Sequence, residues 1–218
     1  MNYYKKVGFY LLFVLNCVII ACTQSSNVNE SDHSAHQHAA AAPAPAAAPK
    51  VTEGYADSVN LGLVQDTIKS SPTRQTMTML NGNHIHITYG SPGVRGRVIW
   101  GGLVPYDQVW ATGAHNATSV MFDKEVMINN QKIAAGTYAF FTIPGKEEWT
   151  LILNKNYNQH LADDYNEKDD IIRVKVKPET QKDITQRLTY KIEETSPKSG
   201  NISVYWEYVK VSLPFSMN

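Results

Sequence analysis

Residues 74–89 have the sequence RQTMTMLNGNHIHITY, and this stretch decides the fold class. Two runs with the composition of strands, 74–80 and 84–89, flank Asn81-Gly82-Asn83. Asn and Gly tolerate the positive φ that a tight turn requires, so the stretch predicts a β-hairpin. We therefore expect antiparallel strands at the start of the folded domain.

The strand pattern continues from this hairpin to the end of the chain. Turn residues recur at 129–130 and 144–148, and helical spacing is weak, confined to 55–67 and 160–165. Many short strands separated by turns indicate an all-β fold, an antiparallel β-sandwich or barrel-like sandwich with little helix. Phe140 and Trp149 are expected between its sheets. The further strands are expected at 119–123, 125–128, 137–143, 149–153, 171–177, 187–192 and 202–211.

The first 22 residues, MNYYKKVGFYLLFVLNCVIIAC, have the order of charges and apolar residues that is typical of a secretory signal. Two lysines precede an apolar run that is too short for a stable membrane span, which argues against an uncleaved anchor helix. The run ends in Ile-Ile-Ala-Cys, which looks like a bacterial lipobox. We expect residues 1–21 to be a lipoprotein signal peptide and Cys22 to carry the lipid. The lipid bilayer is then a partner, and the protein belongs in a Gram-negative cell envelope, at the outer membrane.

Residues 22–50 are expected to form a disordered tether that begins at the lipidated Cys22. Alanine, proline and serine dominate, and such a composition buries too little apolar surface to fold. Histidines at 33, 36 and 38 could bind zinc, copper or nickel weakly, or simply keep the spacer polar. Residues 51–218 are long enough for a single β domain.

Charge and cysteine content restrict the classes of function. Cys17 leaves with the signal peptide and Cys22 carries lipid, so no disulfide is expected. Removal of residues 1–21 leaves 18 basic against 20 acidic side chains. A balance this close to neutral gives no electrostatic reason to expect a nucleic-acid partner.

Three long segments in a fixed order carry a resemblance to a known family. They are SPGVRGRVIWGGLVPYDQVWATGAHNATSVMF, AGTYAFFTIPGKEEWTLILNKN and ISVYWEYVKVSLPF. In these segments the chain, over roughly residues 70–215, resembles the domain-of-unknown-function 2911 family of bacterial envelope proteins. The family usually carries Asn where His115 stands, so the GAHxAT form together with HLADDY at 160–165 looks like a subgroup. The resemblance implies a secreted, mainly β domain and supplies no reaction.

Four histidines of the domain are candidate metal ligands: His84, His86, His115 and His160. The first two lie two residues apart on one strand and therefore share a face, while Ile85 and Ile87 take the opposite face. A third imidazole from His115 or His160, with Asp163 or Asp164 as a carboxylate, could complete a zinc site. A His-x-His pair also suits an exposed strand edge with no ligand.

The stretch VWATGAHNATSV, residues 109–120, is the second candidate for a site. Arg97, Trp110, Thr112 and Asn116 could bind a ligand there, with Arg97 or Arg95 as an anion clamp. In the structural alternative, polar side chains bond backbone groups of a turn and Trp110 belongs to the core.

Two classes of function remain open. The first is a tethered module that binds a small ligand, a glycan or another envelope protein. The second is a metal-dependent enzyme, hydrolase-like, in which the histidine cluster holds a divalent ion such as zinc. The signatures of common nucleophile, phosphate and dinucleotide sites are absent from the sequence.

Overall fold

The computed structural model of the chain describes residues 54–217 and contains the hairpin predicted at Asn81-Gly82. This turn joins β1 (Thr73–Leu80) to β2 (Asn83–Gly90), which pair antiparallel from Leu80–Asn83 to Thr73–Gly90. Asn81 and Gly82 have φ values of 47° and 68°. Two consecutive positive φ values are the mark of a type I′ turn, whose twist matches that of the flanking strands. The expected signal peptide, Cys22 and the tether lie outside the described residues.

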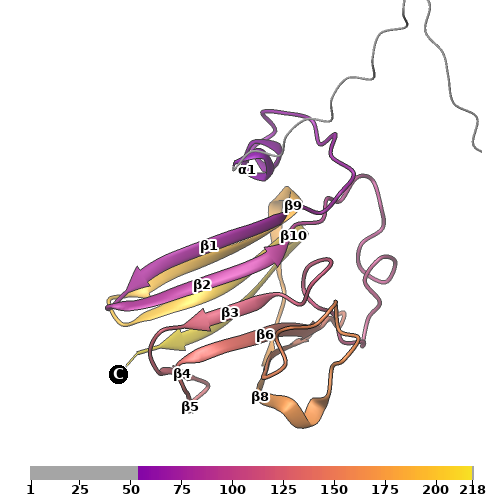
Figure 1. Cartoon of the computed structure of the whole chain (residues 1–218). Coiled ribbons are helices and arrows are strands. Elements are labelled where there is room, and N and C mark those ends of the chain that lie inside the picture. Colours follow the sequence, from indigo (N-terminus) through magenta and orange to yellow (C-terminus); the bar gives the residue numbers. More distant parts are fainter. Residues whose placement is uncertain (1–53, 218) are drawn as a thin grey trace, which may run out of the picture. The chain divides into compact units, whose positions relative to one another are not determined.

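Two antiparallel sheets pack face to face, so the predicted β-sandwich is confirmed. One sheet has six strands in the order β1-β2-β3-β6-β7-β8, and the other has four in the order β5-β4-β10-β9. Figure 1 shows β1, β2, β3 and β6 in front of β9 and β10. The remaining strands are β3 (Ser119–Phe122), β4 (Val126–Ile128), β5 (Gln131–Ile133), β6 (Gly136–Ile143), β7 (Trp149–Asn154), β8 (Asp170–Val176), β9 (Glu179–Ser196) and β10 (Ser199–Ser216).

Strand β10 folds back on itself. The backbone N–H of Met217 donates to the carbonyl of Lys198 at 2.8 Å, and the hydroxyls of Ser203 and Ser212 lie 2.9 Å apart. Both contacts require the two ends of β10 to lie side by side. Glu207, with φ 54°, lies midway between them. The C-terminal half of β10 thus separates its N-terminal half from β4.

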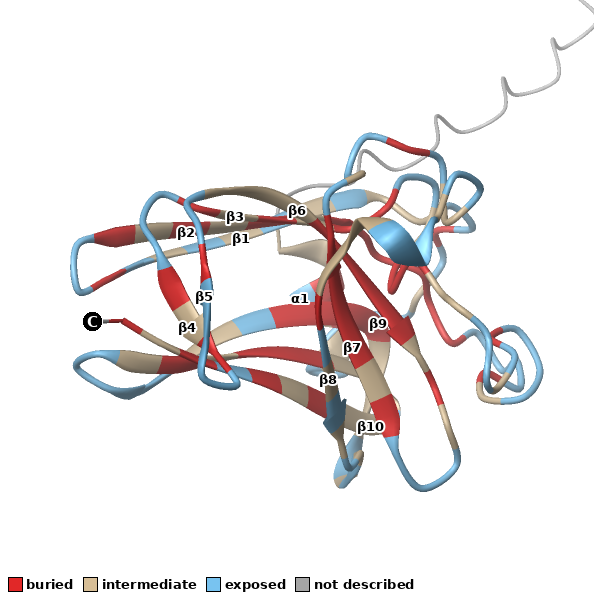
Figure 2. Cartoon of the chain, turned by 90° about the horizontal axis from the view of Figure 1, so that it is seen from below, coloured by how far each residue is buried: buried red, intermediate tan, exposed pale blue. Residues whose placement is uncertain are grey.

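The core lies between the two sheets and is rich in aromatic rings. Phe140 and Trp149 are 0% and 3% exposed, which confirms their predicted burial. The ring of Trp100 meets those of Trp110, Trp149 and Trp206 at centroid distances of 5.9, 4.9 and 5.8 Å. In Figure 2 the buried positions lie mainly on the strands and the exposed ones in the loops.

Helix is scarcer than the weak helical spacing suggested. Only α1 (Tyr55–Asn60) forms within 55–67, and Gly62 with φ 70° follows it. A left-handed glycine just beyond the last turn ends a helix. Residues 160–165 contain turns, with Leu161 at φ 48°, and the 3-10 turn η1 (Glu167–Asp169) lies farther on. Within residues 54–217, no helix has both the length and the apolar content needed to cross a bilayer.

Candidate functional site

His84 and His86 lie on the outer face of β2, as the alternation of the sequence predicted. Both are partly exposed, whereas Ile85 and Ile87 between and beyond them are fully buried. The two imidazole centroids are 6.0 Å apart, and Nδ1 of His84 lies 4.0 Å from Oδ2 of Asp123. The strand therefore carries two partly exposed imidazoles on the outer side of the six-stranded sheet.

His115 and His160 lie on two loops whose backbones are linked to each other. The N–H of Leu161 donates to the carbonyl of His115 at 2.8 Å, and Asn116 forms a β-bridge with His160. Both imidazoles are exposed, and Nδ1 of His160 lies 2.8 Å from Oδ2 of Asp163.

The four histidines do not assemble into the expected zinc site. Among residues 54–217, no group of three or more His, Cys, Asp and Glu side chains is placed to hold a metal ion. The structure brings together His84 with His86, and His115 with His160. A zinc site needs three or four such ligands around one point, so two separate pairs do not provide one.

The stretch 109–120 contains a structural turn rather than a cleft. Thr112 is fully buried; its hydroxyl donates to the carbonyl of Trp110 at 3.1 Å, and its Oγ1 lies 3.0 Å from Oγ1 of Thr142. Its carbonyl accepts from the hydroxyls of Thr118 at 3.1 Å and Tyr190 at 2.9 Å. Burial raises the pKa of Tyr190 well above its ordinary value, so this hydroxyl stays protonated and keeps its donor role. Thr112 and Thr118 thus bond each other within the turn, and Trp110, which is partly buried, packs against the core.

The outer part of this turn leaves little room for a ligand. His115 and Asn116 are exposed above a cavity of about 40 Å³, which Thr73, Thr88 and Gly90 also line. Ligand pockets for small molecules are typically ~300–1,000 Å³, so this cavity suits a few water molecules at most.

The two arginines expected as an anion clamp bond main-chain carbonyls. Arg97 donates from Nε to the carbonyl of Val94 at 3.3 Å and from its terminal nitrogen to that of Gly93. Arg95 donates to the carbonyl of Lys69 at 3.1 Å. Both guanidinium groups are thus engaged in holding the 93–97 loop and the segment before β1.

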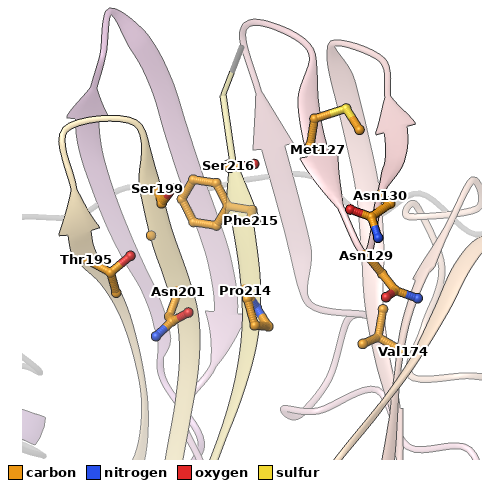
Figure 3. Close-up of a pocket in the computed structure, with 11 residues that line it drawn as sticks. Met127, Asn129, Asn130, Val174, Thr195, Ser199, Asn201, Pro214, Phe215 and Ser216 are labelled. Atoms are coloured by element: carbon orange, nitrogen blue, oxygen red, sulfur yellow. The ribbon is translucent and has the colours of Figure 1, made fainter.

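A groove on the four-stranded sheet is the better candidate, and sequence reasoning missed it. Its volume is about 420 Å³, and Figure 3 shows its wall residues. Asn129 and Asn130 form the β4–β5 turn on one side, and Asn201 lies on β10 on the other side. The other residues that line it are Met127, Val174, Thr195, Ser199, Gly200, Pro214, Phe215 and Ser216.

Amides and hydroxyls supply the polar surface of this groove. Side-chain amides of Asn129, Asn130 and Asn201 make no hydrogen bond to another described residue, so their donors and acceptors face solvent or a ligand. Among residues 54–217, no charged side chain lines the groove. Such a wall is suited to neutral groups that both donate and accept hydrogen bonds.

The carboxylate opposite Asn201 on the neighbouring strand is occupied by internal contacts. Glu193 is the β9 partner of Asn201, and it accepts from Ser203 at 2.5 Å and from Tyr205 at 2.7 Å. Lys210 Nζ lies 3.3 Å from Oε2 of Glu193, the oxygen that accepts from Ser203. Burial pushes the pKa of Glu193 upward, but these hydrogen bonds and the lysine charge outweigh it and hold that pKa below its ordinary value. The carboxylate charge is therefore balanced within the protein.

Only one local pattern in the sequence lies at the groove. Asn129-Asn130 predicts a turn, and the structure has one there, since both residues have positive φ. Nothing local links that turn to Asn201, which approaches it only because β10 folds back and pairs with β4.

Comparisons with known proteins agree with the sequence resemblance. The family model described as "Protein of unknown function (DUF2911)" matches residues 71–215. Neither the curated proteins nor the solved structures gave a match. The matched range contains all ten strands and leaves out only the last residue of β10, Ser216. The family model therefore covers the whole sandwich. The chain belongs to the DUF2911 family.

Proposed function

We propose that this protein is a tethered binding module of the bacterial envelope, and that its groove takes an uncharged glycan. The observation that carries the proposal is the wall of three solvent-facing asparagine amides and several hydroxyls, with no charged side chain among the described residues that line it. Each amide offers two donors and an acceptor, and each hydroxyl offers both roles, as do the hydroxyls of a sugar ring. A volume of about 420 Å³ accommodates one or two sugar rings of a longer chain.

The structure also suggests how tight such binding would be. Phe215 lines the groove but is only 3% exposed, so no aromatic face is available for stacking on a sugar. Recognition then depends on hydrogen bonds between the sugar and the protein, which replace the hydrogen bonds that both make to water. Each such exchange contributes only ~0.5–1.5 kcal/mol net. We expect dissociation constants of about 0.1–1 mM for a single chain end.

The experiment is an NMR titration of the protein with neutral hexasaccharides of glucose, mannose and N-acetylglucosamine. At least one of these sugars should shift the amide signals of residues 127–130, 195–201 and 214–216. Asn201→Ala should weaken the binding of that sugar about tenfold. Asn116→Ala is the matched control, since it removes an exposed asparagine amide from the 109–120 turn and should leave affinity unchanged. Polygalacturonate, a charged glycan, should bind no better than the neutral sugars. No shift with any sugar, or equal affinity in Asn201→Ala, would make the glycan proposal wrong.

The envelope location rests on the Ile-Ile-Ala-Cys sequence at the end of the apolar run. Lipid on Cys22 would anchor the chain, and the His/Ala/Pro tether would hold the sandwich off the bilayer. Cys22→Ala should leave the protein unprocessed or release it from the membrane fraction. Processing and membrane association as in the unmodified protein would rule out this anchor. We also propose that His115, where the family usually carries Asn, marks a subgroup of the family that differs in this turn.

A further inference from the structure

The outer face of β1, β2 and β3 gathers methionine and histidine side chains in register. Met77 on β1 pairs with His86 on β2, and His86 pairs in turn with Met121 on β3. Met79 pairs with His84 beside them. Register partners project to the same side of a sheet, so five side chains, Met77, Met79, His84, His86 and Met121, share one surface. We call this surface the Met–His face.

The hairpin turn brings two of these pairs especially close. In a two-residue hairpin the residues that flank the turn, here Leu80 and Asn83, form a hydrogen-bonded pair, and the pairs then alternate. Met79–His84 and Met77–His86 are therefore non-hydrogen-bonded pairs, in which Cα atoms approach to about 4.5 Å and side chains are closest. With the two imidazole centroids 6.0 Å apart, sulfur and nitrogen atoms can converge on one point between β1 and β3.

Two features of the Met–His face lack a structural explanation. Nε2 of His86 is buried and has no hydrogen-bond partner among the described residues. An unsatisfied buried polar atom costs free energy, so a ligand that accepts or donates at Nε2 would stabilise this position. Met77 and Met79 are 57% and 65% exposed, although thioether side chains gain by burial. Of the five methionines at 77, 79, 121, 127 and 217, three lie on this face.

We propose that the Met–His face binds a monovalent copper ion, Cu(I). His86 is the central ligand through Nε2, with Met77 and Met121 on either side and His84 or Met79 as a further ligand. Thioether sulfur is a soft ligand that selects Cu(I), whereas zinc and the harder divalent ions favour thiolate, imidazole and carboxylate. Asp123 lies 4.0 Å from Nδ1 of His84 and can hold that ring in orientation, as carboxylates do behind metal-bound histidines.

The first experiment assigns the ligands with Ag(I), a redox-inert ion whose preference for soft ligands resembles that of Cu(I). The full chain, labelled with carbon-13 at the methionine methyl groups, is titrated under NMR observation. The methyl signals of Met77 and Met121 should shift until one equivalent of Ag(I) has been added and then stay constant. The signals of Met127 and Met217 should not move. Equal shifts of Met127, or no shift at all, would overturn the proposal.

The second experiment measures affinity for Cu(I) under ascorbate, in competition with bathocuproine disulfonate. Because histidines at 33, 36 and 38 could also bind copper, all three are replaced by alanine in the background protein. His86→Ala and the double variant Met77→Leu/Met121→Leu should each weaken binding at least about tenfold. Leucine nearly conserves the volume of methionine, so the double variant should fold. Met127→Leu and His160→Ala are the matched controls and should bind as the background protein does. Undiminished binding in His86→Ala and in the double variant would place the ion elsewhere and refute the site.

Discussion

Arg187 on β9 and Asp66, in the segment before β1, form a buried ion pair. A terminal guanidinium nitrogen of Arg187 lies 2.6 Å from Oδ1 of Asp66, and Nε donates to the same oxygen at 3.0 Å. The arginine side chain is fully buried and also donates to the carbonyls of Ser70 and Ser91 at 3.0 Å each. This one side chain therefore ties the N-terminal segment to the edge of the sandwich.

Asp66→Ala is expected to destabilise the fold strongly. It leaves the guanidinium of Arg187 buried without its counter-ion, which costs about 3–5 kcal/mol. Urea unfolding at neutral pH measures the change. The control is Asp57→Ala, which removes the bidentate partner of Arg74 at 2.7 Å, where the carboxylate is 54% exposed. An exposed pair contributes about 0–1 kcal/mol, so equal losses in the two variants would contradict the role given to Arg187.

Trp149→Ala is expected to cost about 3–5 kcal/mol through lost transfer free energy and the cavity left behind. The ring is 3% exposed and meets Trp100 edge to face at 4.9 Å. Tyr157→Ala, whose ring is 46% exposed, should change stability far less. An unchanged melting temperature for Trp149→Ala would show that this ring does not contribute to the core between the sheets.

Gly90→Ala tests the close contact between the end of β2 and the 112–118 turn. A Cβ at this position would lie 2.1 Å from the carbonyl oxygen of Ala114, which is backbone and cannot move alone. We expect Gly90→Ala to lower the free energy of unfolding by about 1–3 kcal/mol, as overpacking does in protein cores. Gly96→Ala is the comparison. A Cβ at Gly96 would meet no atom within 4 Å, so this variant carries only the backbone strain of φ 67°. A smaller loss at Gly90 than at Gly96 would mean that the turn can withdraw from β2.

The strands were predictable because their signals are local. The Asn81-Gly82 turn, the alternation around Ile85 and the burial of Phe140 all follow from neighbouring residues, and the structure confirms each. β5 was missed because its three residues carry no alternation of their own and pair only through the Asn129-Asn130 turn. The fold-back of β10 was missed as well, since strand propensity does not distinguish one long strand from two.

The candidate sites depend on long-range pairing and were less predictable. His84 and His86 were correctly placed on one face, but the third ligand was sought at His115 or His160, among residue types typical of zinc. The register instead places Met77 and Met121 beside His86, on strands whose pairing the sequence does not state. Asn201 likewise joins Asn129 in the groove only through tertiary structure.

Glu193 should make the stability of the sandwich depend on pH in acid. Its hydrogen bonds from Ser203 and Tyr205, with the charge of Lys210, hold its pKa below the ordinary value in the folded state, even though burial acts in the opposite direction. A carboxyl with a lowered folded-state pKa binds protons less readily than in the unfolded chain. Its contribution is therefore fully present above the unfolded pKa of about 4.3, and it is lost as the pH falls through the folded pKa.

Glu193→Gln removes this charge and is expected to melt below the unmodified protein at pH 7. The gap between the two melting temperatures should narrow from about pH 4.3 downward, because the protonated glutamic acid then resembles glutamine. Glu194→Gln, at the exposed neighbouring position, is the matched control and should show no such convergence. Melting curves at pH 7, 5, 4 and 3 for the three proteins provide the measurement. A gap between Glu193→Gln and the unmodified protein that stays constant down to pH 3 would mean that Ser203, Tyr205 and Lys210 do not favour the ionised carboxylate.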